Sequence, residues 1–187
     1  MSIDQRKHAL LVRKAEEWLR RCYRCGIVLS EQYATVGEIP DVIGWRGNCR
    51  SVVVECKVSR GDFLADANKP CRTTPDESMG CERFFLTPPG LVASEEVPKP
   101  WGLLEYGRNG VRLLIKPGRT SLRSPAGLMK EMNLLLASLR RVEIRIEPQT
   151  ITDFLKWRNR MVHYNGGIPP VGLATPELNE YSQLQQN

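Results

Sequence analysis

The chain has 187 residues, of which 41% are hydrophobic, and this size and composition suit one domain with a tail. It contains no run of about 18 apolar residues, which excludes a membrane-spanning helix, and its charged N-terminus lacks the apolar stretch of a signal peptide. We therefore expect a cytoplasmic protein without a membrane partner.

The net charge of +6 is unevenly distributed along the chain. Residues 108–160 include 12 basic and 4 acidic side chains, whereas the remainder has a small acidic excess. A basic segment beside an acidic site is typical of a protein that binds a polyanion such as DNA and acts on it. A solvated charged surface would have the same composition, so charge alone leaves both interpretations open.

The spacing of apolar residues predicts the first elements. Residues 4–25 fit an amphipathic helix that ends at Gly26 and whose inward face is formed by Leu11, Ala15, Trp18 and Cys22. Residues 27–33 predict a first strand. Two β-branched runs, 38–45 and 51–57, are separated by a short turn and predict a β-hairpin.

This hairpin carries charged side chains where a core strand would have none. Asp41 lies near the start of the first run, and Glu55 and Lys57 lie at the end of the second. Alternation along a strand places Glu55 and Lys57 on one face and Cys56 on the other. Two carboxylates beside a lysine suit a hard cation such as Mg²⁺, with the Cys56 carbonyl as a further oxygen ligand. Lys57 would hold or deprotonate a water molecule, or stabilise charge on a phosphate.

The same residues resemble a known signature. The Pro-Asp pair at 40–41 and the Glu-Cys-Lys triplet at 55–57 are similar to the PD-(D/E)xK motif of the restriction-endonuclease-like nuclease superfamily. Residues 55–66 resemble the stretch E-x-K-x-S-R-x-D-F-x-x-D of bacterial and prophage proteins related to the DNA repair protein MmcB, as do residues 83–92 and 100–105. Together the matches extend over roughly residues 8–115.

The resemblance implies an α/β fold in the order αβββαβ, with a central mixed β-sheet flanked by helices and with extra C-terminal helices. Residues 1–117 would form the nuclease core, 118–162 a basic helical extension of the same domain, and 163–187 an extended or disordered tail. The implied activity is that of a DNA endonuclease that uses Mg²⁺, or Mn²⁺ in its place, in DNA repair, recombination or phage DNA processing. Several members of the superfamily act as homodimers, and the sequence leaves the oligomeric state open.

The resemblance also implies roles for individual residues. The catalytic residues are expected to be Asp41, Glu55 and Lys57. The expected metal ligands are Asp41, Glu55, the carbonyl of Cys56 and a third carboxylate, for which Glu31 is preferred. Members of the family often place a glutamate of the first helix near the metal, so the alternatives to Glu31 are Glu16 and Glu17.

The segment after the hairpin supplies candidate phosphate contacts. Residues 58–69 predict a short helix with Ser59 as its N-cap and with Phe63 and Leu64 inward, and the turn-rich stretch 69–80 predicts a surface loop. We expect the substrate phosphates to contact Ser59, Arg60, Lys69 and Arg72, although a capping or solvated role is the alternative for each. Asp62 and Asp66 are interpreted as structural residues or as partners of Arg60 or Lys69.

Further strands are predicted over 82–86, 102–106 and 111–115, the last two as a hairpin at the edge of the sheet, with Trp101 in the core. Beyond residue 117 the pattern predicts helices over 126–141 and 150–161. The apolar face of the first of these helices would consist of Leu128, Met132, Leu135 and Leu139.

The chain has six cysteines and two histidines. Cys22 and Cys25 have the spacing of metal ligands, and some nucleases of this superfamily hold iron–sulfur clusters. Both cysteines also continue the apolar face of the first helix, which favours burial over a zinc or iron–sulfur site. Neither His8 nor His163 belongs to a predicted catalytic set.

Two alternatives to the nuclease remain. The first is a nucleic-acid-binding protein on the same fold that no longer cuts. The second is purely structural, with Asp41 as a turn residue and with Glu55 and Lys57 as an ion pair. The presence of all three signature residues favours the enzyme.

Overall fold

The computed structural model describes residues 2–33, 38–69, 77–118 and 124–145, together with Thr152 and Leu155. The chain divides into two compact units, residues 1–135 and 136–187. Of the second unit the structure describes only a stretch of helix, residues 136–145, and the two single residues. The predicted tail 163–187 lies outside the described residues, as does almost all of the predicted helix 150–161.

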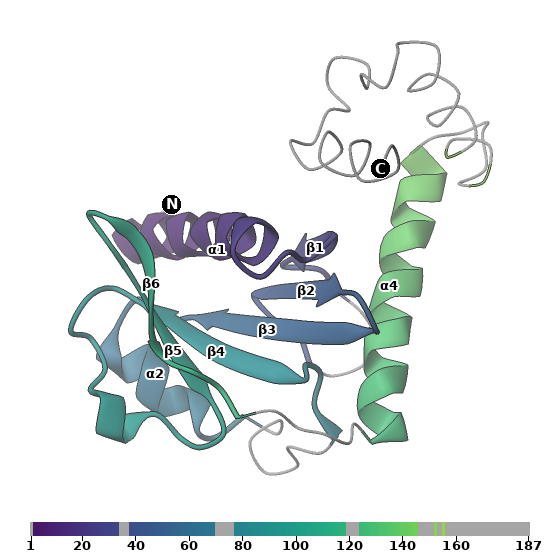
Figure 1. Ribbon diagram of the computed structural model, residues 1–187. Helices are drawn as coiled ribbons and strands as arrows, with labels where there is room; N and C mark the ends of the chain where they lie inside the picture. Colours follow the sequence, from purple (N-terminus) through teal and green to yellow (C-terminus); the bar gives the residue numbers. More distant parts are fainter. Residues whose placement is uncertain are drawn as a thin grey trace, which may run out of the picture. The chain divides into compact units, whose positions relative to one another are not determined.

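A six-stranded mixed sheet forms the centre of the first unit, and its strands follow one another in chain order (Figure 1). The pairs β1–β2, β2–β3 and β5–β6 are antiparallel, whereas β3–β4 and β4–β5 are parallel. The strands are β1 (Ile27–Ser30), β2 (Val42–Arg46), β3 (Arg50–Cys56), β4 (Glu82–Thr87), β5 (Gly102–Gly107) and β6 (Gly110–Ile115).

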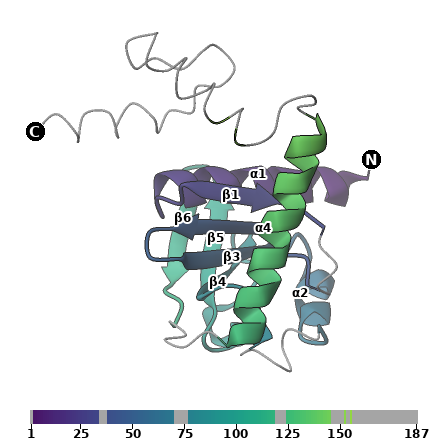
Figure 2. The same ribbon diagram turned by 90° about the vertical axis from the view of Figure 1, so that its right-hand side faces the viewer.

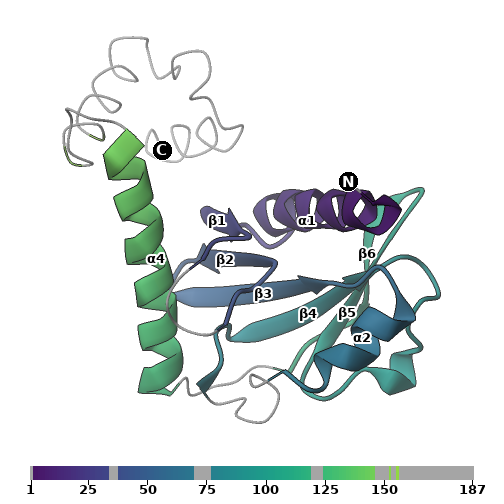
Figure 3. The ribbon, with the colours of Figure 1, turned by 180° about the vertical axis from the view of Figure 1, so that it is seen from behind.

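Helices lie on both faces of this sheet, as the views from the front and from behind show (Figures 1 and 3). They are α1 (Ile3–Arg21), α2 (Arg60–Asp66) and α4 (Pro125–Arg145), with a short 3-10 helix, η2 (Ser94–Glu96). Helix α1 begins at a capping box in which the Ser2 side chain accepts from the backbone of Gln5 and the Gln5 side chain accepts from the backbone of Ser2. The predicted α/β class, its mixed sheet and the order αβββαβ are confirmed.

Alternation along β3 divides the core into two layers. Val52, Val54 and Cys56 face α1 and pack with its buried residues, together with Phe84 and Leu86 of β4. The opposite face of the sheet holds two further clusters. One joins Phe63 of α2 to Phe85, Trp101 and Leu103, and the other joins Leu134 of α4 to Ile43, Val53 and Met79. The prediction of Trp101 as a core residue is therefore confirmed.

Two predictions for the first two helices are wrong in detail. Helix α1 ends at Arg21, earlier than predicted, and Cys22 is its exposed C-cap, whereas Cys25 is buried in the turn that follows. In α2, Phe63 is buried as predicted, but Leu64 is exposed because this short helix presents only one side to the sheet.

The predicted apolar face of α4 is also wrong. Leu128, Met132 and Leu139 are exposed and Leu135 is half-buried, whereas the residues of this helix that are buried include Glu131 and Leu134. Hydrogen bonds explain this orientation of the helix. The Glu131 carboxylate accepts them from the Trp45 indole (2.9 Å), the Ser51 hydroxyl (2.8 Å) and the Gly80 amide (2.9 Å). These bonds fix which side of α4 meets the sheet, and Figure 2 shows the first turns of the helix beside β3 and β4.

None of the helices in the described part of the chain combines the length and the apolar character needed to cross a membrane.

Replacing Glu131 with alanine is expected to destabilise the fold by about 3 kcal/mol, because three buried or half-buried donors lose their acceptor. Urea denaturation followed by circular dichroism measures this. Met129→Ala on the same helix is the control: its side chain is exposed, so a change within about 0.5 kcal/mol is expected. Equal stabilities of the two variants would contradict this account of α4.

Candidate active site

The β2–β3 hairpin brings the two predicted carboxylates together. Val42 pairs with Val54, so continuing the register by one residue places Asp41 opposite Glu55. The Cys56 amide donates to Oδ2 of Asp41 at 2.7 Å, which ties the start of β2 to the end of β3. The negative charge of Asp41 is also one of the causes that raise the pKa of Glu55. Asp41 and Glu55 are therefore neighbours at the end of the hairpin, and their sharing of one metal ion stays a prediction.

Asp41 has a second partner that sequence reasoning missed, His8 of α1. Nε2 of His8 lies 3.4 Å from Oδ2 of Asp41, and Nδ1 lies 3.9 Å from Glu31. Burial would raise the pKa of Asp41, but the hydrogen bonds from His8 and from the Cys56 amide hold it below its usual value. The same contact with Asp41 raises the pKa of His8 although burial opposes this.

The sequence pattern assigned His8 to no catalytic set, whereas the structure places it beside Asp41. The signal that could have identified His8 is its position one turn before the buried residues Leu11 and Val12 of α1.

Glu16 and Glu17, the two alternatives to Glu31 as third carboxylate, also lie on α1 but away from His8 or paired elsewhere. Glu17 pairs with Lys14 at 2.7 Å, and Glu16 lies eight residues, or about 12 Å along the helix, from His8.

Glu31 lies at the rim of the site. Its side chain is 60% exposed, and its backbone amide donates to the carbonyl of Asp41 at 3.0 Å. The structure therefore places Glu31 next to Asp41 and His8, and its role as a third metal ligand stays a prediction.

Glu55 is buried in a cluster of four charged side chains. Its Oε2 lies 2.8 Å from Nζ of Lys69 and 3.5 Å from Nζ of Lys57. Asp66 of α2 lies 2.8 Å from Lys57 and 3.1 Å from Lys69. Burial and the charge of Asp41 raise the pKa of Glu55. Burial would lower the pKa of Lys69, but Glu55 and Asp66 raise it.

Lys57 follows β3 and points into this cluster. The structure confirms the shared side of Glu55 and Lys57, and the backbone of Lys57 donates to the Leu86 carbonyl of β4 at 3.0 Å. Cys56 points the other way, into the core under α1, and its burial raises the pKa of its thiol well above the usual range. The alternation predicted this direction of the thiol, and the role of the Cys56 carbonyl as a metal ligand stays a prediction.

The predicted phosphate contacts are placed differently from one another. Ser59 caps α2, and its hydroxyl accepts from the amide of Asp62 at 3.2 Å. Arg60 is paired with Glu96 of η2 rather than with Asp62 or Asp66, since both of its terminal nitrogens bind that carboxylate. Lys69 belongs to the charged cluster, and Arg72 lies outside the described residues.

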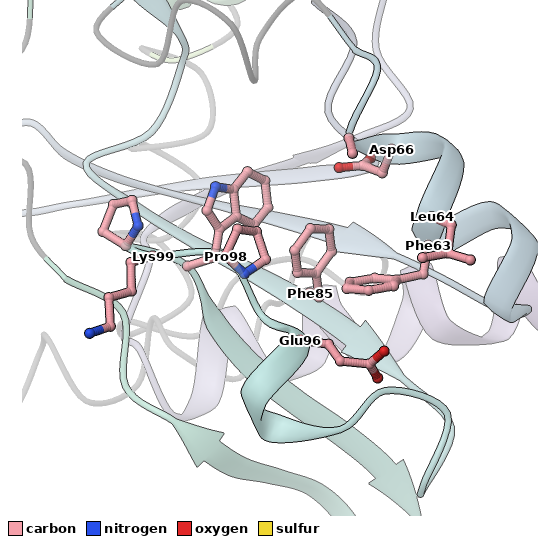
Figure 4. A pocket seen from close by; sticks show the side chains of 10 residues that line it. Phe63, Leu64, Asp66, Phe85, Glu96, Pro98 and Lys99 are labelled. Atoms are coloured by element: carbon pink, nitrogen blue, oxygen red, sulfur yellow. The ribbon is translucent and has the colours of Figure 1, made fainter.

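A pocket of about 330 Å³ adjoins the cluster on the α2 side of the sheet (Figure 4). Phe63, Phe85 and Trp101 form apolar walls, and Asp66 is shared between the pocket and the cluster. The rings of Phe85 and Trp101 stack on each other, with centroids 4.4 Å apart. The site therefore has an apolar side and a charged side.

Whether these residues fit a divalent cation can be judged from their donor atoms. In the described part of the chain, no three His, Cys, Asp or Glu side chains are gathered as a metal-binding set. Mg²⁺ does not need one, because it is commonly bound by one or two carboxylates and keeps several waters and substrate oxygens. Asp41 and Glu55 fit that mode. The described cysteines form no disulfide, and the set required for a zinc or iron–sulfur site is likewise not found among the described residues.

The fold and the site together define an α/β protein in which a buried charged cluster lies at the end of the central strand. No protein-family model matches the sequence, and no curated protein matches it. Among solved structures, the SPO1766 protein of unknown function from Silicibacter pomeroyi is similar, with a TM-score of 0.56 and 22% identity over 75% of this chain and 93% of that chain. This likeness concerns the fold alone.

The contact between His8 and Asp41 predicts a pH dependence in the metal-free protein. The pKa of His8 is raised from 6.5 and that of Asp41 is lowered from 3.8. The pair therefore stabilises the fold fully between these two values. Its contribution is lost as the pH rises through the folded pKa of His8, and again as the pH falls through the folded pKa of Asp41.

The direct measurement is an NMR titration of the imidazole signals. Asp41→Asn is expected to lower the pKa of His8, because its main hydrogen-bond partner loses its charge. The signal of His163, the other histidine of the sequence, is the reference. An unchanged titration of His8 in Asp41→Asn would contradict the pairing.

Proposed function

We propose that this protein is a metal-dependent deoxyribonuclease of the PD-(D/E)xK superfamily, which hydrolyses phosphodiester bonds of DNA. The observation that supports this most strongly is the convergence of Asp41, Glu55 and Lys57 at the end of the β2–β3 hairpin. Asp41 directly precedes Val42, Glu55 directly follows its partner Val54, and Nζ of Lys57 lies 3.5 Å from Glu55. An ion pair of Glu55 and Lys57 alone, the structural alternative, is compatible with this contact but does not explain why Asp41 is their neighbour.

In this proposal each residue has a task that its surroundings support. Asp41, whose pKa is lowered, is an anion at neutral pH and is a ligand for Mg²⁺ or Mn²⁺. Glu55 is the second ligand, and a cation beside it would offset the effect of burial on its pKa. The further oxygen ligands in this proposal are Glu31, whose amide donates to the Asp41 carbonyl, and the carbonyl of Cys56. Lys57 donates hydrogen bonds to the attacking water or to the phosphate.

The reaction is the addition of water to phosphorus and the departure of a sugar oxygen, which takes up a proton. When bound, the divalent ion supplies Lewis-acid stabilisation of the charge on the phosphate and activates the water. The protein's part is to hold the carboxylates, orient Lys57 and restrict access of bulk water on the apolar side of the site. Such chemistry requires no covalent intermediate with the protein.

A second candidate, a DNA-binding protein on the same fold that does not cut, is favoured by one observation. Lys69 lies 2.8 Å from Glu55, where it neutralises a carboxylate that the nuclease needs for its metal. If Lys69 cannot leave, Glu55 cannot bind a divalent ion. A role in DNA repair, recombination or phage DNA processing also belongs to the proposal, as does the cytoplasm as the compartment. So does DNA binding by the basic segment 108–160, in which Arg112 pairs with Glu105.

Plasmid nicking tests the proposal. The wild-type protein is expected to nick supercoiled DNA with Mg²⁺ or Mn²⁺ and to spare it with EDTA. Lys57→Ala and Asp41→Asn are each expected to reduce the rate by about 100-fold or more, because each removes a group that stabilises charge at the phosphate.

Lys14→Ala is the matched lysine control, since Lys14 pairs with Glu17 outside the cluster. Its rate should remain within about twofold of the wild type. Cleavage by Lys57→Ala at the wild-type rate would refute the catalytic assignment. DNA binding without any nicking, under all metal conditions, would support the non-cleaving alternative.

A further inference from the structure

The Lys57 ammonium group lies closer to Asp66, with which it forms an ion pair, than to the signature glutamate, to which it donates a hydrogen bond. Among the described residues, three carboxylates lie within 4 Å of its Nζ: Asp66 at 2.8 Å, Glu55 at 3.5 Å and Asp62 at 3.9 Å. Asp66 and Lys57 are both almost completely buried, with side chains 1% and 4% exposed. A buried ion pair of this kind has few alternative arrangements, so α2 determines where the ammonium group points.

Lys69 is the more exposed lysine of the same cluster. It bridges Glu55 and Asp66, at 2.8 and 3.1 Å, but its side chain is 42% exposed and can reach water by rotation. Lys57 has no such route because its side chain is enclosed. The two lysines that contact Glu55 therefore differ in how easily they can leave it.

If Lys69 moves away from Glu55, the charges that remain in the site are those of three carboxylates and one lysine. The charge of Asp66 offsets that of Lys57, and the carboxylates of Asp41 and Glu55, when both are ionised, match the charge of one divalent cation. If Glu55 alone held Lys57, a metal ion on Glu55 would repel that lysine from the site. A carboxylate on α2, outside the pair of expected ligands, removes this conflict.

We propose that Asp66 is a positioning residue that keeps the Lys57 ammonium group at the cation site, while Lys69 leaves Glu55 to make way for the divalent ion. This inference rests on the proposed nuclease function and adds the residue that orients Lys57. Asp66 acts through Lys57 and does not contact the reacting atoms. Lys69, once released, is free to bind a phosphate of the substrate.

The kinetic test compares Asp66→Asn with Asp62→Asn. Both substitutions remove one carboxylate charge from α2, but Asp62 is 44% exposed and lies 3.9 Å from Lys57. Asp66→Asn is expected to lower kcat by 10- to 100-fold, roughly the effect of losing a residue that orients an active-site group, with KM for DNA changed less than about twofold. Asp62→Asn should change kcat by less than about twofold, and Asp66→Glu should recover part of the loss. Wild-type kcat in Asp66→Asn would overturn the inference.

A second readout does not depend on cleavage. Ammonium protons that are buried and hydrogen-bonded exchange slowly with water, so Lys57 is expected to give an NMR ammonium signal, assigned with Lys57→Arg. This signal should disappear in Asp66→Asn and persist in Asp62→Asn, and it should also persist in the wild type when Mg²⁺ displaces Lys69. If the wild type cuts no DNA, the proposed function fails, and the Lys57 signal alone decides the inference. Loss of that signal on addition of Mg²⁺, or its persistence in Asp66→Asn, would overturn it.

If Asp66→Asn does not fold, as judged by circular dichroism, Asp66→Glu takes its place. The longer side chain keeps the charge but moves the carboxylate, so a reduced kcat with an unchanged KM is expected. A kcat equal to that of the wild type together with an unshifted Lys57 signal would overturn the inference in this case.

Discussion

Four charged side chains meet at the end of β3, and three of them, Glu55, Lys57 and Asp66, are almost completely buried. Two carboxylates, Glu55 and Asp66, face two ammonium groups, Lys57 and Lys69. Burying one of these charges alone would destabilise the folded state, and the pairing of opposite charges offsets this loss of free energy. The cluster therefore constrains the strand and the helix together, because two members come from or follow β3 and two from or follow α2.

The sheet explains why the site lies where it does. The hairpin supplies Asp41 and Glu55 from antiparallel neighbours, while the parallel pairing of β3 with β4 requires a crossover, and α2 forms part of it. Helix α2 consequently returns past the end of β3 and brings Asp66 to Lys57. On the opposite face, α1 packs over Val52, Val54 and Cys56 and brings His8 to Asp41. Three elements thus converge on one strand end, with an apolar pocket on one side (Figure 4).

The sequence predicted the hairpin and its charged residues well, because both depend on local alternation. The shared side of Glu55 and Lys57 follows from a period of two, and the register of β2 and β3 follows from a short turn. Contacts between segments that are distant in the sequence could not be predicted from local alternation or turn length. His8 and Asp41 are 33 positions apart, and Arg60 finds Glu96 rather than a neighbour on its own helix. The buried side of α4 was not predicted, because it is determined by the Glu131 carboxylate, which accepts three hydrogen bonds from the sheet and the segment before β4, and not by the row of apolar residues.

The account depends on Asp41 and Glu55 accepting a divalent cation in place of the ammonium group of Lys69. Crystals grown without metal and soaked in Mn²⁺ would test this directly through an anomalous difference map. The account predicts one peak at about 2.1 Å from carboxylate oxygens of both Asp41 and Glu55, with Lys69 withdrawn and Lys57 still on Asp66. A map without such a peak, in which Lys69 still contacts Glu55, would contradict it.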